Sequence, residues 1–95
     1  MKEGFVYILT NRTDGVLYIG VTDDLARRLD QHRMGDVPGF AKKYNCTQLV
    51  WFERHENIHD ARTAERRMKA WKREWKIKRI EEVNPAWEDL SQALV

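Results

Sequence analysis

The sequence contains little of what marks several common protein classes. It has one cysteine, Cys46, which excludes an intrachain disulfide and favours a reducing, cytoplasmic location with a free, partly buried thiol. It has no repeat and no low-complexity segment, and only two prolines and five glycines. No apolar run approaches the roughly 18 residues of a membrane span, and the short apolar stretch over 5–9 is not typical of a signal peptide. No association with membranes is therefore expected.

The composition that remains is typical of a small globular protein. Hydrophobic residues make up 42% and charged residues 34% of the 95 residues, which is enough for one domain with one modest core. We expect a single domain over 1–95, with a core over 1–83 and a C-terminal tail over 84–95. The tail carries apolar residues at spacings that allow it to pack on the core, namely Trp87, Leu90 and Leu94. The expected state is a monomer or a weak homodimer.

Apolar periodicity and turn residues predict the order of the elements. Residues 5–10 and 16–21 are rich in β-branched and aromatic side chains, and the turn residues 11–15 between them favour an antiparallel hairpin. The remaining elements are a helix from the N-cap Thr22 to about Arg33 that stops at Gly35, a loop or short helix over 35–45, a strand over 48–53, a basic helix over 58–71 and a helix over 75–83 ended by Asn84-Pro85. The order ββαβαα predicts an α+β fold, in which a small three-stranded sheet is flanked by helices.

The hairpin decides how two tyrosines lie. If its loop is 11–14, Tyr7 and Tyr18 lie opposite each other and project from one face of the sheet. A two-residue turn at Asp14-Gly15 would shift that pairing along the strands. The sequence leaves both registers open.

Two polar residues share the apolar face of the helix over 22–33. Leu25 and Leu29 define that face, and residues three, four and seven apart lie on the same side of a helix. Arg28 and His32 fall on this face, so we expect the guanidinium and the imidazole to point towards the sheet or a pocket beside it. A histidine near a helix C-terminus is also common because of the helix dipole.

A carboxylate interrupts the apolar stripe of the basic helix. Glu65 lies among residues that recur at spacings of three and four, namely Ile58, Ala61, Ala64, Met68 and Trp71. An inward glutamate needs a hydrogen-bond partner, a counter-charge or a metal ion, because burying it alone costs too much free energy. The alternative is that Glu65 lies at the border of the stripe and forms a salt bridge with a neighbouring arginine.

The opposite face of that helix is strongly basic. The net charge is only +2, yet residues 61–79 carry nine Lys/Arg against two Glu, with Trp71 and Trp75 among them. Such a block is expected of a surface that binds a phosphate backbone, although solvated basic helix faces are common too. The candidate nucleic-acid contacts, including a basic pair in the loop over 35–45, are Lys42, Lys43, Arg62, Arg66, Lys69, Lys72 and Arg73.

The polar residues that these patterns turn inward form a set suited to phosphodiester chemistry. They are Tyr7, Tyr18, Arg28, His32 and Glu65. Oxygen ligands suit Mg²⁺, an arginine stabilises negative charge on a phosphate, and a tyrosine or histidine can accept a proton from water. At these positions the chain resembles the GIY-YIG endonuclease family, and among its members the short stand-alone bacterial proteins.

The resemblance rests on motifs spread over nearly the whole chain. Tyr18-Ile19-Gly20 matches the second half of the family name, and Phe5-Val6-Tyr7 stands where Gly-Ile-Tyr is usual. The helix residues Leu25 to Leu29 match the segment that carries the family arginine, here Arg28. The other matched positions are His32, Glu65, the late Asn84 and the tail Asn84-Pro85-Ala86-Trp87-Glu88-Asp89-Leu90.

The resemblance implies a catalytic set and a cofactor. One Mg²⁺ or Mn²⁺ would bind to Glu65, and a single carboxylate implies one metal ion rather than two. Arg28 would neutralise the phosphate, and Tyr18 or Tyr7 would act in the base network with help from His32. Asn84 is included as the family asparagine.

Together these observations predict a metal-dependent endonuclease that hydrolyses DNA phosphodiester bonds. We expect selectivity for single-stranded, branched or nicked DNA, as in repair or recombination, while RNA stays open as a substrate. The basic helix and loop would then supply most of the affinity, which should fall steeply with salt. The alternative is a nucleic-acid-binding module with little or no cleavage activity.

A second motif points to different chemistry. His55-Glu56-Asn57-Ile58-His59 satisfies the zinc-protease pattern H-E-x-x-H, which needs both histidines on one face of a helix. Here the segment spans a strand end and a helix start, and capping at Asn57 or at His59-Asp60 would disturb that geometry. No third ligand is evident. We therefore expect the match to be coincidental.

Overall fold

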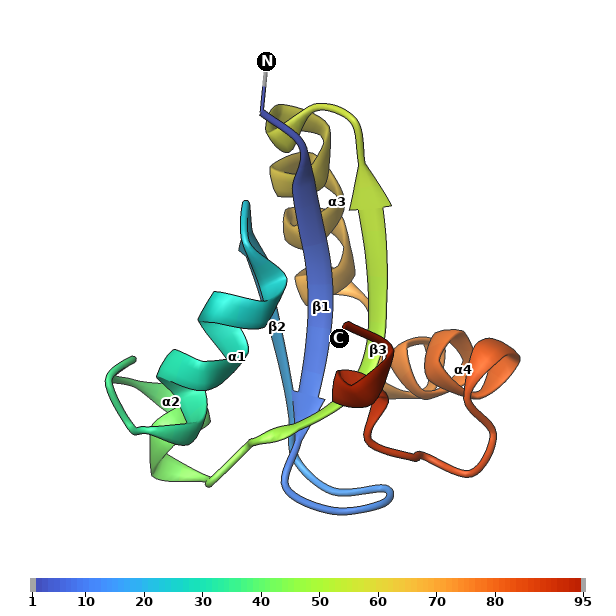
Figure 1. The fold of residues 1–95 in the computed structure, drawn as a ribbon. Coiled ribbons are helices and arrows are strands. Elements are labelled where there is room, and N and C mark those ends of the chain that lie inside the picture. Colours follow the sequence, from blue (N-terminus) through green and yellow to red (C-terminus); the bar gives the residue numbers. More distant parts are fainter. Residues whose placement is uncertain (1, 95) are drawn as a thin grey trace.

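A computed structural model describes residues 2–94, which form a three-stranded antiparallel sheet with helices on both of its faces (Figure 1). The strands are β1 (Gly4–Thr10), β2 (Leu17–Thr22) and β3 (Gln48–His55), in the order β2-β1-β3, so β1 is central. The helices are α1 (Leu25–Arg33), α2 (Phe40–Lys43), α3 (Ile58–Ala70), α4 (Arg73–Val83) and the 3-10 helix η1 (Leu90–Leu94). This architecture confirms the predicted α+β fold.

Alternation along β1 divides the core between the two faces of the sheet. Val6 and Ile8 point to the face covered by α3 and α4, where they pack with Ala61, Met68 and Ile80. The other face of β1 packs against α1, α2 and η1, and the residues buried there include Tyr7, Leu9, Leu25, Leu29 and Ala41. Successive strand residues point to opposite faces, so Tyr7 is placed on the side of α1. Figure 1 shows α1 in front of the sheet and α3 behind it.

A glycine at the start of β1 lets α3 approach the sheet closely. A Cβ atom on Gly4 would lie 2.8 Å from Ile58 Cα and 2.9 Å from Ala61 Cβ. Both distances are too short for real side-chain atoms, so the first turn of α3 rests on the backbone of β1. This close contact fixes where the first turn of α3 lies along β1, and therefore where the later residues of α3 lie relative to the sheet.

The hairpin has a register that differs from both expected alternatives. Tyr7 pairs with Gly20 and Tyr18 pairs with Leu9, so the connecting loop spans residues 11–16. The two tyrosines are therefore diagonal neighbours on one face instead of lying directly opposite. They still project from the same face because their positions differ by an even number of residues along the ladder.

Hydrogen bonds within the loop explain its length. The Asn11 side chain accepts from Val16 N at 3.0 Å, and the Thr10 hydroxyl donates to Arg12 O at 2.8 Å. Gly15 N donates to Arg12 O at 2.9 Å, which closes a turn inside the loop. These side-chain bonds compete with further strand pairing, which a count of turn residues does not detect.

The start of α1 also differs from the prediction. Asp24, not Thr22, is the N-cap, and its side chain accepts from Arg27 N at 3.2 Å. Thr22 instead ends β2, where it pairs with Phe5 and its hydroxyl oxygen accepts from Asp24 N at 3.1 Å. The expected stop at Gly35 is confirmed, because Gly35 has a φ of 75° and donates to His32 O.

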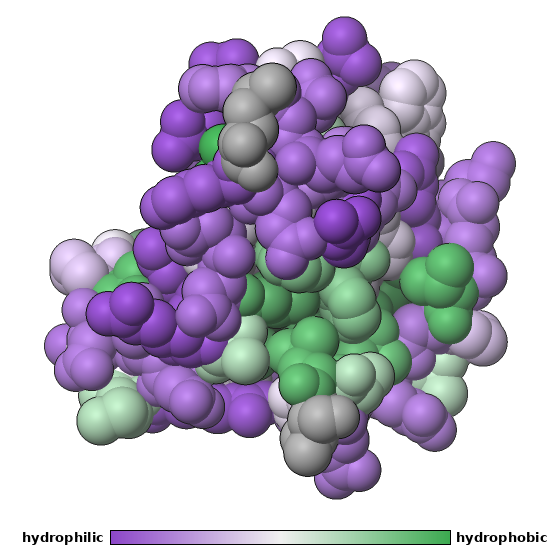
Figure 2. Space-filling view, turned by 45° about the horizontal axis from the view of Figure 1, so that its top comes forward, coloured by the Kyte–Doolittle hydropathy of each residue, from purple (hydrophilic) through white to green (hydrophobic). Residues whose placement is uncertain are grey.

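The tail packs on the body through its apolar residues. Trp87 is buried, and its indole nitrogen donates to Glu81 Oε2 at 2.8 Å. Leu90 and Leu94 of η1 lie against the cluster on the α1 side. Figure 2 shows hydrophilic residues over most of one face of the molecule, with an apolar area in its lower half. Within residues 2–94, no helix has the length and apolar character needed to cross a bilayer.

Candidate active site

A hydrogen bond between β1 and α1 forms the centre of the site. Tyr7 is only 1% exposed, and its hydroxyl lies 3.0 Å from His32 Nε2. His32 is also buried, on the face of α1 that Leu25 and Leu29 hold against the sheet. The predicted inward position of His32 is therefore confirmed. The bond joins residues 25 positions apart, so it depends on α1 packing correctly against β1.

Tyr18 completes a cluster of three rings. Its ring centroid lies 6.2 Å from that of Tyr7 and 5.4 Å from that of His32, and the Tyr7–His32 distance is 5.9 Å. We call Tyr7, Tyr18 and His32 the tyrosine–histidine cluster. Tyr18 is half-buried whereas Tyr7 and His32 are buried, so Tyr18 is the member of the cluster that a substrate can reach most easily.

The cluster requires a glycine beside it. A Cβ atom on Gly20 would lie 2.5 Å from both the hydroxyl oxygen and Cζ of Tyr7. The Tyr7 ring therefore lies directly over the Gly20 backbone, and any side chain at residue 20 would displace it. This contact gives a physical reason for the glycine in the Tyr18-Ile19-Gly20 motif.

The surroundings of the cluster set its protonation. Burial raises the pKa of Tyr7 above its ordinary value, and Tyr18 and Glu65 raise it further, while Arg28 opposes them. Burial lowers the pKa of His32 below 6.5, and Arg28 adds to this effect. At neutral pH the Tyr7 phenol is therefore protonated and the imidazole neutral. Because Arg28 and Glu65 act on the pKa of Tyr7, both charges lie within electrostatic range of the phenol.

Glu65 is both turned inward and paired in a salt bridge, the two arrangements that the sequence left open. Its side chain is only 14% exposed, yet it forms an ion pair with Lys69, with 3.1 Å between Glu65 Oε2 and Lys69 Nζ. The partner is a lysine four residues on in α3 instead of the arginine considered as the alternative. The carboxylate is thus largely shielded from solvent and is balanced by a half-exposed cation. Its charge is a minor influence on the pKa of Tyr7.

The residues present fit a single hard metal ion. Within residues 2–94 there is no group of three or more His, Cys, Asp or Glu side chains arranged to hold a metal. Zinc sites need such a group, whereas Mg²⁺ is commonly held by one or two carboxylates together with water and phosphate oxygens. Glu65 is therefore the residue that would hold an ion here, with most of the coordination shell left to water and substrate.

Two basic clefts lie next to the site. One, of about 220 Å³, is lined by Arg28, Arg62 and Lys2, and by residues at the end of β2 and Asp23 just after it. The other, of about 250 Å³, runs from Tyr18 and Phe40 to Lys69 of α3 and Lys76 of α4. Phosphates bound in these clefts would lie beside Arg28 on one side and Tyr18 on the other.

Asn84 has a different environment from the tyrosine–histidine cluster. It is 5% exposed and caps the C-terminus of α4. Its amide nitrogen donates to Val50 O at 3.0 Å and Glu88 O at 2.9 Å, and its oxygen accepts from Glu88 N at 3.0 Å. These bonds attach the tail to β3. The structure gives Asn84 a structural task, and its catalytic role stays a prediction.

The basic residues predicted to bind nucleic acid also have different surroundings. Arg73 donates to Asp14 O at 2.8 Å and Gly15 O at 2.6 Å, so its guanidinium closes the hairpin loop. Lys43 lies over the Tyr44 ring on α2, 5.4 Å from its centroid, and Lys69 pairs with Glu65. Exposed basic side chains remain along this surface at Lys42, Arg62, Arg66 and Lys72.

The H-E-x-x-H motif does not have the geometry of a zinc site. His55 ends β3, whereas His59 lies in the first turn of α3. Between them Asn57 is the N-cap of α3, and its side chain accepts from His59 N at 2.9 Å. His55 Nε2 lies 2.9 Å from Glu53 Oε1, without the angles of a hydrogen bond. The two histidines are therefore not on one helix, as the coincidental interpretation predicted.

Sequence reasoning missed Gly20 and Lys76 as parts of the site. Gly20 was part of a matched motif, but its contact with Tyr7 depends on the strand register. Lys76 lines the cleft beside Tyr18 because the first turn of α4 comes close to the residues that begin β2, Leu17 to Ile19. No local pattern predicts that proximity. The pairing of Lys69 with Glu65 could have been predicted from their spacing of four residues.

Comparisons with known proteins identify the family of this chain. The family described as the GIY-YIG catalytic domain matches residues 3–78. The chain belongs to the GIY-YIG family. It is 36% identical over 76 residues to a UPF0213 protein of Pediococcus pentosaceus, covering 80% of each chain. It is 32% identical over 82 residues to a UPF0213 protein of Staphylococcus aureus strain N315, covering 86% of this chain and 99% of the relative.

A solved structure has the same fold. The solution NMR structure of a UPF0213 protein from Bacillus halodurans matches with a TM-score of 0.58 and 24% identity, and the match covers 95% of each chain. The resemblance to short GIY-YIG proteins inferred from the sequence motifs is therefore confirmed. This GIY-YIG chain is a member of a nuclease family, and its cluster lies on β1, β2 and α1 within the matched residues.

Proposed function

We propose that this GIY-YIG protein is a metal-dependent endonuclease that hydrolyses DNA phosphodiester bonds. The observation that carries the proposal is the tyrosine–histidine cluster, in which the Tyr7 hydroxyl lies 3.0 Å from His32 Nε2. Glu65, whose side chain is only 14% exposed, and Arg28 both influence the pKa of the same phenol. A neutral hydrogen-bonded network, a fixed cation and one metal-ligating carboxylate are the parts that in-line hydrolysis of a phosphodiester needs.

The residues divide the chemistry between them. A Mg²⁺ or Mn²⁺ ion held by Glu65 would supply Lewis acidity to the scissile phosphate. Arg28 lines the cleft beside the cluster and offers its guanidinium to the non-bridging phosphate oxygens. Tyr18, being half-buried, is placed to contact the attacking water, and Tyr7 and His32 form the buried hydrogen bond behind it.

The protonation of the cluster favours Tyr18 over Tyr7 for contact with the nucleophile. The raised pKa of Tyr7 opposes its ionisation, so it does not provide a ready phenolate. The lowered pKa of His32 keeps the imidazole neutral and able to accept a proton that passes along the network. Tyr7 and His32 are therefore positioning residues in this proposal, because they act on the water through Tyr18.

The substrate that we propose is structured DNA with single-stranded, branched or nicked regions, of the kind that arises in repair or recombination. The clefts on either side of the cluster are short and basic, and they suit phosphate contacts better than the reading of a long base sequence. RNA remains an alternative substrate. A binding module with little cleavage is the second candidate function, favoured by the ion pair that occupies Glu65.

Replacing Glu65 by glutamine tests the proposal. The purified protein should cleave nicked, branched or single-stranded DNA with Mg²⁺ or Mn²⁺, and chelation should stop it. Glu65→Gln should lower kcat by about 1,000-fold or more, because the charge that holds the ion is worth several kcal/mol in the transition state. Affinity for uncut DNA should be retained. Glu74→Gln is the matched control, since Glu74 is the other acid of residues 61–79 and is exposed.

Two outcomes would contradict this assignment. Equal cleavage by Glu65→Gln and the parent protein would remove the metal role of Glu65. Binding of all four DNA forms, duplex included, without cleavage in either metal ion would support the binding module.

A further inference from the structure

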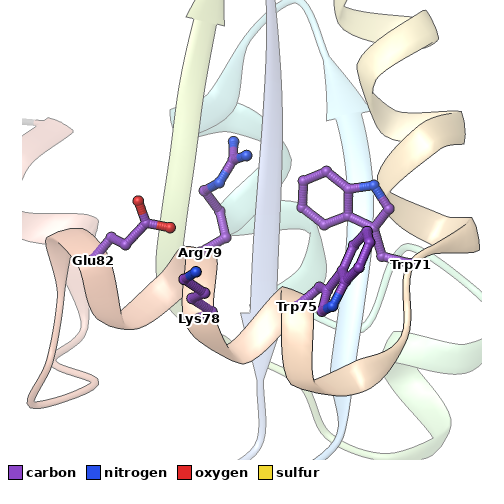
Figure 3. Close-up of a pocket in the computed structure, with 5 residues that line it drawn as sticks. All are labelled: Trp71, Trp75, Lys78, Arg79 and Glu82. Carbon is purple, nitrogen blue, oxygen red and sulfur yellow. The ribbon is translucent and has the colours of Figure 1, made fainter.

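A cleft outside the tyrosine–histidine cluster joins two tryptophans to basic residues. It lies at the junction of α3 and α4, has a volume of about 360 Å³, and is lined by Trp71, Trp75, Lys78, Arg79 and Glu82 (Figure 3). We call it the tryptophan cleft. Its volume is at the lower end of the roughly 300–1,000 Å³ that small-ligand sites occupy. Trp75 is 58% exposed, so more than half of this side chain is accessible to a ligand.

The two indoles form a corner open to solvent. Trp71 is the C-cap of α3 and Trp75 lies in the first turn of α4. Their ring centroids are 6.4 Å apart and their planes make an angle of 67°. A flat ring that stacks on Trp75 would therefore present its edge to Trp71. Figure 3 shows the two rings projecting side by side from this junction.

A cation is held at the back of the corner. The guanidinium of Arg79 lies 4.9 Å from the ring centroid of Trp71 and 6.0 Å from that of Trp51. Held by two aromatic rings, it keeps its direction better than a free surface arginine would. Lys78 adds a second positive charge at the rim, and Glu82 is the acid that lines the cleft. The combination suits a ligand that carries both an aromatic ring and negative charge.

The cleft is connected to the proposed active site by positive charge. Lys76 of α4 lines the cleft beside Tyr18, and Arg79, three residues on and therefore on the same side of the helix, lines the tryptophan cleft. The segment 61–79 that supplies Trp71, Trp75 and these cations carries nine Lys/Arg against two Glu, so it is strongly basic. A strand with its phosphate near Tyr18 can follow these cations to the tryptophans.

We propose that the tryptophan cleft binds an unstacked nucleobase of a single-stranded segment, with Lys78 and Arg79 contacting the flanking phosphates. This proposal rests on the proposed function, because that function is the reason to expect nucleic acid as the ligand. Bases in a duplex are stacked on each other and cannot enter the corner, whereas an unpaired base can stack on an exposed indole. The cleft would thus favour substrates with an unpaired stretch next to the cut.

The test compares ligands with and without bases. Fluorescence anisotropy without divalent metal measures Kd for a short oligothymidylate, an abasic oligomer of equal length and a matched duplex. The parent protein should bind the oligothymidylate more tightly than the abasic oligomer. Trp75→Ala should raise Kd for oligothymidylate by roughly 5- to 150-fold and remove that preference, because a base–aromatic stack is lost. Duplex affinity should stay unchanged.

Further variants separate stacking from charge. Trp75→Phe keeps an aromatic face and should preserve the preference for bases over abasic ligand. Lys78→Ala should weaken binding of both oligomers alike, since it removes a phosphate contact. Val83→Ala is the matched control, because Val83 is an exposed apolar residue of the same helix outside the cleft. Both Trp75 and Val83 are exposed, so these variants should retain the fold.

The inference fails if Trp75→Ala binds the oligothymidylate as tightly as the parent does, or if the parent does not distinguish it from the abasic ligand. Such results would leave the cleft to a protein partner. Cleavage with Mg²⁺ is measured separately. Trp75-dependent binding without cleavage overturns the nuclease proposal alone, and cleavage without Trp75-dependent binding overturns this inference alone.

Discussion

Tyr7 and Asn84 are both buried polar residues that match family positions, but the molecule uses them differently. The Asn84 amide has backbone partners on both its nitrogen and its oxygen, which join α4, β3 and the tail. The Tyr7 hydroxyl forms a hydrogen bond with another side chain, His32, and the charges of Arg28 and Glu65 influence its pKa. A buried polar group bonded to backbone stabilises the fold, whereas one bonded to titratable side chains can move protons.

Loss of the Tyr7 hydroxyl should have a larger effect on cleavage than any change at Asn84. Tyr7→Phe removes the hydroxyl and leaves the ring over Gly20 in place. We expect kcat to fall by about 100-fold, as is usual when a member of a proton-transfer network is lost, with KM for DNA unchanged. Single-turnover cleavage measures the loss. Tyr44→Phe, in a 40% exposed tyrosine far along the chain, is the control. An unchanged kcat in Tyr7→Phe would make its hydroxyl a structural group like Asn84.

The second prediction concerns the stability that Asn84 provides. Asn84→Ala removes the hydrogen bonds to Val50 and Glu88 and leaves a buried carbonyl without its donor. The free energy of unfolding should fall by about 2–4 kcal/mol, measured by urea denaturation. Below the melting transition, kcat should equal that of the parent. Gln92→Ala, an exposed change in the same tail, should leave stability unaltered. A large loss of kcat in a stable Asn84→Ala protein would restore the catalytic role predicted for this residue.

A weaker effect is expected at Lys69, the partner of Glu65. Lys69 pairs with Glu65 at 3.1 Å, so a metal ion must compete with its ammonium group for the carboxylate. Lys69→Gln should tighten Mn²⁺ binding by about two- to fivefold, the range that partly exposed ion pairs support. Isothermal titration without DNA measures this, with Lys72→Gln as the control. Weaker Mn²⁺ binding in Lys69→Gln would mean that the lysine orients the carboxylate instead of blocking it.

Local patterns were enough to predict most of the architecture. The β-branched runs predicted the strands, and the spacing of Leu25, Leu29 and His32 predicted which side of α1 faces the sheet. The stripe of α3 left Glu65 either inward or at the border with a salt bridge, and the structure combines the two, with 14% exposure and an ion pair to Lys69. These predictions succeed because side-chain direction in a helix or strand follows from position along the chain.

The features that could not be predicted depend on distant partners. The hairpin register follows from hydrogen bonds of Asn11 and Thr10 inside the loop, and the N-cap of α1 moved to Asp24 because Thr22 stays in the strand. Arg73 was expected on a nucleic-acid surface but closes the hairpin loop from 58 residues away. Charge and periodicity do not reveal which distant part of the chain an exposed side chain will contact.

Residue patterns were sufficient to predict the element order, the inward position of His32 and, through motifs at fixed spacing, membership of a nuclease family. Only the tertiary structure decided that Tyr7 lies over Gly20, that Asn84 holds the tail, and that Trp71, Trp75 and Arg79 form a cleft. The difference follows from how far apart along the chain the interacting residues lie. Helix and strand periodicity act over a few residues, whereas these contacts arise when packed elements bring separate parts of the chain together.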